Sequence, residues 1–138
     1  MYKRIAVLLL SLFCITVVGF AQTCRDKNNM TIGKIESDGT VRNSSNMKIG
    51  CFDRNNVIRD ANNMKVGSIG GSTIRDKNNM KIGSIESNGT VRDANNMKIG
   101  SVESNGTVRD ANNMKMGRVE GVNQTYAAVF YFFNLFNH

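Results

Sequence analysis

The sequence is poor in the side chains that most often carry chemistry. Its 138 residues include one histidine, at the last position, and three cysteines, and they include neither proline nor tryptophan. Because chain ends fray, His138 is a weak candidate for a catalytic or metal-binding group. The cysteines have no histidine close to them in the sequence, so they do not form a zinc-binding pattern. The lack of proline and tryptophan excludes little by itself.

Carboxylates do not supply an active site either. Glu36, Glu86 and Glu103 occur singly and in nearly identical sequence settings. General acid–base catalysis needs two groups whose environments differ, so that one donates a proton while the other accepts one. We therefore predict that the protein is not an enzyme and that it uses no cofactor and no metal ion.

The first 21 residues have the pattern of a secretory signal peptide. Lys3 and Arg4 precede an apolar run over 5–18, and small residues at Gly19 and Ala21 mark a cleavage site. The run is shorter than the roughly 20 residues that span a bilayer, although an uncleaved anchor is the alternative. We expect cleavage after Ala21, no transmembrane span afterwards, and a secreted or periplasmic protein.

Cleavage would change the charge of the chain. It removes two of the 18 basic residues and none of the 11 acidic ones, which leaves a net charge of +5. A positive balance favours an anionic partner without identifying it. No aromatic residue recurs among the basic ones, which argues against single-stranded nucleic acid, because its bases need aromatic side chains to stack on. We expect no nucleic acid partner.

A repeat of 17 residues fills the sequence from 24 to 124. Its arginines are spaced by 17 residues, except for one step of 16, and two further columns, an asparagine and a glycine, are also identical in all six units. Such a repeat is typical of arrays of one supersecondary unit. The three columns are Arg25, Arg42, Arg59, Arg75, Arg92, Arg109; Asn29, Asn46, Asn63, Asn79, Asn96, Asn113; and Gly33, Gly50, Gly67, Gly83, Gly100, Gly117.

Each unit predicts two short antiparallel strands. Asn-Asn, Gly and Asn-Gly in every unit would break a helix, and they provide two turn signals. Three-residue turns with Gly89 and Asn96 in the left-handed conformation would pair Ile85 with Val91. The same register pairs Arg92 with Lys98 and Val91 with Ile99.

Two features of the units require local adjustments. Ile99 and Val102 are three residues apart, so a bulge or bend at Gly100-Ser101 is needed to bring both to the core. The third unit is one residue shorter, at 70–72, which predicts a two-residue hairpin. We predict an all-β fold in which tandem hairpins close into a ring, because closure removes exposed strand edges.

The repeat, followed by an apolar aromatic tail, resembles the bacterial 5-fold β-flower proteins over nearly the whole mature chain. The resemblance rests on units such as 91–107, VRDANNMKIGSVESNGT. It implies hairpin petals around a pseudo-five-fold axis, and it implies no established activity and no functional residues. The chain departs from that pattern because it has six units. Either the first and last half-units close one petal, or the symmetry is six-fold.

These observations divide the chain into a signal peptide (1–21), a repeat domain (22–125) and a closing segment (126–138). The apolar stretch 126–136, YAAVFYFFNLF, could be a strand buried on both faces or a short buried helix. We predict that it plugs or closes the ring. The alternative is an exposed patch that docks a membrane or a partner, or that forms an oligomer.

The basic columns are the candidate binding site. Like charges placed opposite each other are unfavourable, so their repetition suggests an anionic polysaccharide, glycan or lipid head group as ligand. The interpretation that we favour is a solvated strand face that discourages aggregation, with Glu86, Glu103 and the turn aspartates offsetting its charge. The protein would then be a structural or interaction module of the cell envelope, with an envelope protein as its partner, and the anionic ligand is the alternative. The candidates are Arg42, Arg59, Arg75, Arg92, Arg109, Lys65, Lys81 and Lys98.

Three further columns have a structural and a chemical interpretation. The aspartates that follow the arginines are expected to cap turns, with calcium binding as the alternative. The six methionines are expected in the core, with a soft-metal channel as the alternative. Cys24 and Cys51 could form a disulfide in an oxidising compartment, although they lie in different columns, and their side chains could point to opposite faces.

Overall fold

Twelve short strands and the turns between them make up most of the folded chain. A computed structural model describes residues 22–121 and 123–136 of the protein. The predicted signal peptide lies outside these described residues. The strand bounds are Gln22–Asp26 (β1), Thr31–Ile35 (β2), Thr40–Asn43 (β3), Lys48–Phe52 (β4), Val57–Asp60 (β5), Lys65–Gly70 (β6), Thr73–Asp76 (β7), Lys81–Ile85 (β8), Thr90–Asp93 (β9), Lys98–Val102 (β10), Thr107–Asp110 (β11) and Lys115–Val119 (β12).

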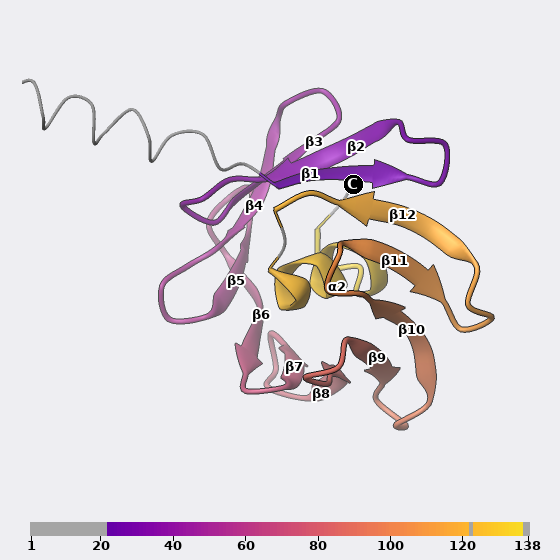
Figure 1. Ribbon diagram of the computed structural model, residues 1–138. Coiled ribbons are helices and arrows are strands. Elements are labelled where there is room, and N and C mark those ends of the chain that lie inside the picture. The colour runs from indigo at the N-terminus through magenta and orange to yellow at the C-terminus, as the bar shows by residue number, and fades with distance from the viewer. Residues whose placement is uncertain (1–21, 122, 137–138) are drawn as a thin grey trace, which may run out of the picture.

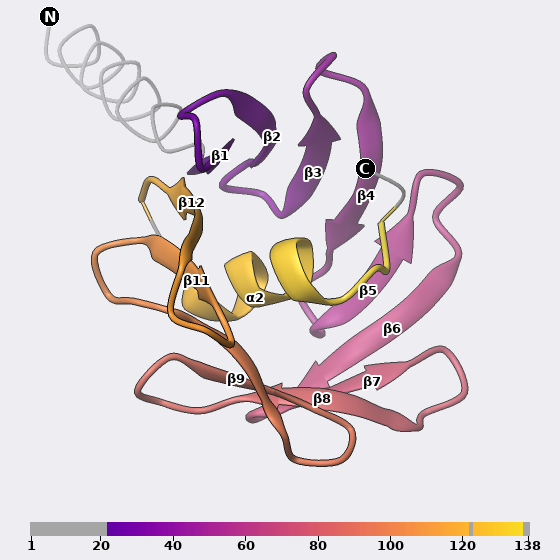
Figure 2. The same cartoon turned by 90° about the vertical axis from the view of Figure 1, so that its right-hand side faces the viewer.

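The strands form one closed antiparallel barrel. Each strand pairs with its neighbours in the sequence, and β1 pairs with β12 to complete the ring. Figures 1 and 2 show the hairpins arranged around helix α2 (Gln124–Phe132). Closure leaves no strand edge open to further pairing. The predicted all-β ring of hairpins is therefore confirmed, whereas its five-fold or six-fold symmetry stays a prediction.

Two kinds of turn alternate around the barrel. In the first kind the repeated asparagine is left-handed, with φ of 68° at Asn96. In the second kind a glycine is left-handed, with φ of 93° at Gly89, or an asparagine in its place, with φ of 61° at Asn56. Asparagine tolerates this conformation best among residues that have a Cβ, and glycine has no penalty there. The shortened third unit pairs Gly70 with Thr73 around a two-residue turn. All three turn predictions are confirmed.

The strand register is as predicted at one end of the unit and shifted at the other. Ile85 pairs with Val91 and Lys98 pairs with Arg92, as expected. Val91, however, pairs with Gly100, so the predicted pairing with Ile99 is wrong. The bulge also lies one residue earlier than predicted, because Ile99 is the extra residue. An inserted residue reverses the alternation of faces, and Gly100 therefore faces the core together with Val102.

The tail forms helix α2 (Gln124–Phe132) inside the barrel (Figure 2). The Asn123 side chain caps it by accepting a hydrogen bond from the Tyr126 N–H at 3.1 Å. A strand enclosed by a closed barrel would find no free edge to pair with, whereas a helix satisfies its own backbone groups. The prediction of a buried plug is confirmed.

Each of the six glycines in the invariant column faces one side chain of the tail. A Cβ added to any of the six would lie within 2.4–3.0 Å of that side chain, closer than packed atoms approach, and within 2.1–2.6 Å of a carbonyl on the neighbouring strand. The glycine column is therefore invariant within the chain because the plug and the backbone of the neighbouring strand together occupy the space that a side chain would need. The pairs are Gly33 with Phe130, Gly50 with Phe136, Gly67 with Leu135, Gly83 with Phe133, Gly100 with Phe132, and Gly117 with Tyr131.

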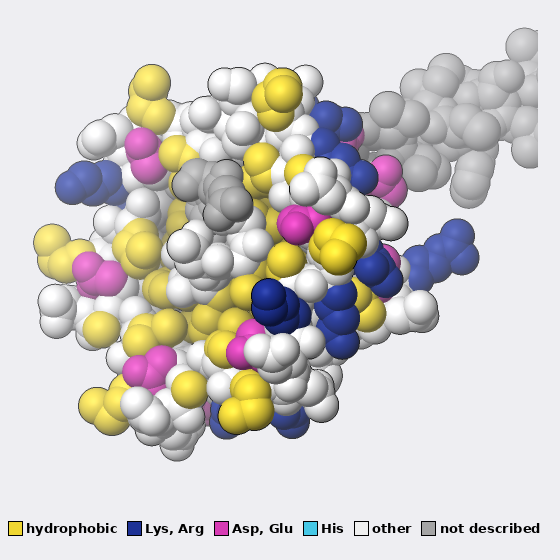
Figure 3. All heavy atoms as spheres, turned by 180° about the vertical axis from the view of Figure 1, so that it is seen from behind, with side chains coloured by type: hydrophobic (Ala, Val, Ile, Leu, Met, Phe, Trp, Pro, Cys, Tyr) yellow, Lys and Arg dark blue, Asp and Glu magenta, His cyan; other side chains and the backbone are white. Residues whose placement is uncertain are grey.

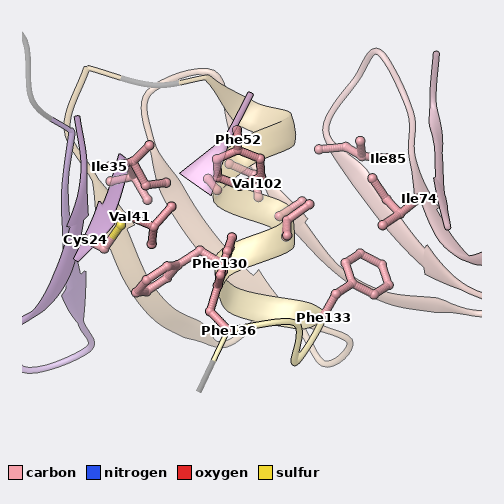
Figure 4. Packing of buried hydrophobic residues seen from close by; sticks show 14 of the residues in the cluster. Cys24, Ile35, Val41, Phe52, Ile74, Ile85, Val102, Phe130, Phe133 and Phe136 are labelled. Atoms are coloured by element: carbon pink, nitrogen blue, oxygen red, sulfur yellow. The ribbon is translucent and has the colours of Figure 1, made fainter. Parts of the chain in front are cut away.

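The rest of the core combines repeated and unique residues. One Val, Ile or Cys per unit, the residue before each arginine, is fully buried and points inward, as Figure 4 shows for Cys24, Val41 and Ile74. Phe52 stacks on Tyr126 with ring centroids 4.0 Å apart. These contacts fix the helix to the wall of the barrel.

The plug also holds the junction between the first and last strands. Arg25 of β1 faces Arg118 of β12 across this junction. The Tyr131 hydroxyl lies 2.6 Å from the carbonyl oxygen of Arg25, to which it donates, and 3.2 Å from that of Arg118. A single side chain of the tail thus contacts both ends of the repeat array where no turn connects them.

Candidate functional site

The interior of the barrel is filled by the protein's own side chains. Phe130 and Phe136 are fully buried, and Phe133 is 6% exposed. The alternative in which the tail forms an exposed docking patch is therefore wrong. An oligomer built on this segment is also not favoured, because these aromatic rings face the barrel wall. The exposed side chains of the barrel are therefore the candidates for a functional site.

The predicted basic residues form a belt around the outside of the barrel. Lys65, Lys81 and Lys98 lie directly opposite Arg59, Arg75 and Arg92, as the register predicted. The belt also contains pairs that the prediction left incomplete, although they have the same sequence pattern. These further pairs are Arg42 with Lys48 and Arg109 with Lys115.

Most arginines of the belt already hold a carboxylate. In each such pair the arginine Nε lies 2.5–3.2 Å from a carboxylate oxygen, and both side chains are partly exposed. Pairs of this kind contribute less than about 1 kcal/mol each, but they offset the charge of five arginines. The glutamates therefore act as partners of the arginines. The pairs are Arg25–Glu120, Arg42–Glu36, Arg59–Asp53, Arg92–Glu86 and Arg109–Glu103.

A second contact fixes the orientation of each guanidinium. One terminal nitrogen donates to the backbone carbonyl of the asparagine four residues later, at 3.1–3.3 Å in all six units. Arg75 makes this bond to Asn79 at 3.1 Å. Among the described residues, Arg75 is the member of the column that has no ion pair. Sequence reasoning missed this difference, although the sequence shows that the third unit is one residue shorter than the others.

The turn aspartates cap the hairpins, as predicted. The Asp93 carboxylate accepts the backbone N–H groups of Asn95 at 2.9 Å and Met97 at 3.0 Å. The same pair of bonds recurs in the other units, with an asparagine side chain in the second one. Because one oxygen of each carboxylate is occupied by the backbone, the calcium alternative is not favoured.

Asp53 both caps a turn and pairs with an arginine. Its carboxylate accepts the Val57 and Asn55 N–H groups at 2.9 Å and also the Arg59 Nε–H at 3.2 Å. These contacts favour the charged form and hold the pKa of Asp53 below its usual value, with the bond from Val57 as the largest cause.

The methionine column is exposed, so the prediction that it lies in the core is wrong. All six side chains are 64–65% exposed. Met97 pairs with Asp93 in the turn, beyond the layers that the plug fills, so the core ends before it is reached. The same exposure argues against an interior metal channel. Figure 3 shows hydrophobic side chains at several tips around one face. The six exposed methionines are Met30, Met47, Met64, Met80, Met97 and Met114.

The two cysteines are free, so the predicted option of a disulfide is wrong. Cys24 lies in the inward-facing column, whereas Cys51 pairs with Arg59 and Thr40 on the outer face. Their different columns do place them on opposite sides of the sheet. Burial raises the pKa of the Cys24 thiol to about 12, which makes it an inert core residue.

Two other kinds of site were sought in the described part of the chain. Residues 22–121 and 123–136 contain no group of three or more carboxylate, thiol or imidazole side chains placed to bind a metal ion. The helical structure in the same residues is too short and insufficiently apolar to span a membrane.

These features define a class of protein. It is a closed barrel of repeated hairpins, filled by its own C-terminal segment, with capped turns and paired charges on the outside. Residues 21–135 match the family described as 5-fold beta-flower protein, and the chain belongs to this family. The family indicates a non-catalytic repeat protein. A comparison with curated proteins gives no match.

Proposed function

We propose that the protein is exported and that it binds a protein of the cell envelope through the outside of its barrel. The proposal of export rests on the signal-like pattern of 1–21. Cleavage after Ala21 would leave every strand of the barrel intact, because β1 begins at Gln22. The fold would then operate in the periplasm or outside the cell.

The observation that carries the binding proposal is the exposure of the six methionines. Large apolar side chains that recur at equivalent exposed positions mark an interaction surface more often than isolated ones do. Methionine is unbranched and flexible, and it suits binding surfaces that must adapt to their partner. We call the six turns that carry these residues the methionine tips.

The surroundings of the tips favour a protein partner. Each methionine follows a left-handed asparagine whose turn is fixed by bonds to a carboxylate or amide, so the side chain projects from a rigid hairpin. In five of the six units a lysine comes next in the sequence. Apolar groups with a charged border match the apolar core and polar rim of protein interfaces.

Methionine footprinting tests this proposal on the unmodified protein. Peroxide oxidises exposed methionines to the sulfoxide, and mass spectrometry gives the rate at each position. In purified protein the six tips should react fast, and the half-buried Met116 should react slowly and serve as the internal control. In intact cells, several tips should be protected.

The proposal of a binding surface would be overturned if the tips reacted in cells as fast as in purified protein. Export is scored separately in the same digest, because a mature N-terminus at Gln22 supports cleavage and a retained Met1 contradicts it. A variant with glutamine at all six tips should lose the association with the envelope, whereas Ala94→Ser, at the exposed neighbouring turn position, should keep it together with the protection of its methionines.

Binding of an anionic glycan or lipid head group by the whole belt is the alternative. It is less favoured, because five of the six arginines in the column already hold a carboxylate of the chain.

A further inference from the structure

The third unit lacks the carboxylate that the other units provide. Its hairpin pairs Gly70 with Thr73, in the same way that Glu86 bonds to Thr90 in the fourth unit. Gly70 therefore occupies the position that holds Glu36, Asp53, Glu86, Glu103 or Glu120 elsewhere. The third unit, which is one residue shorter at this turn, thus has a glycine where the other units have an acidic residue.

The space of the missing carboxylate is open. A Cβ added to Gly70 would meet no atom within 4 Å, in contrast to the crowded glycines of the core. Arg75 is still held by the bond to the Asn79 carbonyl, which fixes the other five guanidiniums as well. Its Nε–H is therefore presented at a vacant position that is already shaped to hold a carboxylate.

The charged groups around this position are mostly basic or already paired. Glu86, which follows β8, is held by Arg92. Residues 70–85 contain three basic side chains and one acidic one. That acid, Asp76, accepts the N–H groups of Asn78 and Met80. On the neighbouring strands Arg75 faces Ser68 and Lys81. A carboxylate bound here would receive a charge-assisted hydrogen bond and would lie close to a second cation.

We propose that Arg75 is an anion-binding site that takes the carboxylate of an acidic sugar. The guanidinium matches a carboxylate, as the paired arginines of the same column demonstrate within this chain. The adjoining positions, Ser68, Ser72 and Thr73, have the small hydroxyl side chains that suit sugar hydroxyl groups. The proposal does not depend on export or on the methionine tips.

Nitrogen-15 NMR of the arginine Nε–H groups tests the proposal on the folded chain 22–138. Oligogalacturonate is titrated in, and the paired arginines serve as internal controls. The Arg75 signal should move in a saturable manner, while those of Arg92 and Arg109 stay in place. Added salt should weaken the response, because the site is partly exposed to solvent.

Gly70→Glu is the decisive variant, because it restores the missing partner within the chain. It should reduce the Arg75 response about tenfold or more, as loss of one charge-assisted contact predicts. Gly70→Ala, which adds only the Cβ, should bind like the wild type. Unchanged backbone spectra of both variants would show that the barrel is intact.

Three results would overturn the proposal. An Arg75 signal that does not move with oligogalacturonate excludes the site. Equal movement of all the arginine signals would indicate diffuse charge attraction. A response to polyglutamate in the absence of one to oligogalacturonate would assign the position to an acidic protein segment. None of these results bears on the footprinting of the methionine tips.

Discussion

The inner and outer faces of the barrel use the same repeat in opposite ways. Outside, the complete units make equivalent contacts: an aspartate, or an asparagine in the second unit, caps the turn, an asparagine carbonyl holds the arginine, and a carboxylate pairs with it. Inside, six identical glycines each meet a different side chain of the plug. Repetition thus builds the wall, and one non-repetitive segment determines how its interior is filled.

The comparison also explains why two glycines that look alike in the sequence have different meanings. Gly83 is crowded by Phe133 and by the next strand, whereas Gly70 stands in open space. The first is required by packing, and the second marks a missing side chain. Local sequence alone does not separate the two, because the difference lies in what faces each position.

The largest effect is expected from adding a methyl group inside the barrel. In Gly83→Ala the new Cβ would lie 2.4 Å from the Phe133 ring and 2.5 Å from the Arg92 carbonyl oxygen. Overpacking of this kind should lower the free energy of unfolding by about 3 kcal/mol, measured by urea denaturation.

Gly70→Ala is the matched control for that experiment. It should be neutral or stabilising by about 0.4–1 kcal/mol, because alanine restricts the unfolded chain. Combining Phe133→Leu with Gly83→Ala should recover part of the lost free energy of unfolding, because leucine lacks the ring atoms that the new Cβ would contact. Equal stabilities of Gly83→Ala and Gly70→Ala would contradict the assigned role of the plug.

An intermediate effect is expected at the turns. Asn96 has φ of 68°, and its polar side chain tolerates the left-handed region, which the methyl group of alanine does not. Asn96→Ala should therefore cost about 1–2 kcal/mol. Asn96→Gly should change stability much less, since glycine adopts this conformation freely. Chemical denaturation of both variants measures the difference. If the glycine variant lost as much stability as the alanine one, the asparagine side chain and not its backbone would be decisive.

The smallest effect is expected on the outer surface and depends on pH. The pKa of Asp53 is lowered in the folded state, so its contribution to stability is present above the unfolded pKa of about 3.9 and is lost as the pH falls through the folded pKa. Asp53→Asn keeps an acceptor but does not titrate there. The stability advantage of wild type over this variant should therefore shrink below about pH 4.

Unfolding curves of the two proteins between pH 7 and pH 2.5 measure this difference. A difference that does not change with pH would mean that the charge of Asp53 contributes nothing. A difference that grows toward low pH would contradict the sign of the shift.

Much of the fold was predictable because the repeat restricts the alternatives. The two turns, the pairing of Ile85 with Val91 and the alignment of Arg92 with Lys98 follow from turn chemistry and from matching apolar residues. The bulge at Ile99 was misplaced by one residue, because a glycine suggested the bend. That glycine is instead required by Phe132 of the plug.

The candidate site was predictable only in part. The positions of the basic belt followed from the register, and so did the presence of carboxylates that offset its charge. Which carboxylate pairs with which arginine did not follow, because most of these pairs reach across a turn. The ion pair between Arg25 and Glu120 joins residues at opposite ends of the repeat array, and it exists only because the barrel closes. The exposure of the methionines likewise depends on where the plug ends.

The sequence by itself determined the hairpins, since short-range turn preferences and the alternation of apolar residues act within a few residues of each other. Only the tertiary structure decided that the ring closes between β1 and β12 and that the tail becomes a helix. It also decided which charges remain unpaired. Those outcomes depend on contacts between residues distant in the sequence, and a repeat looks the same whether or not such a contact is made.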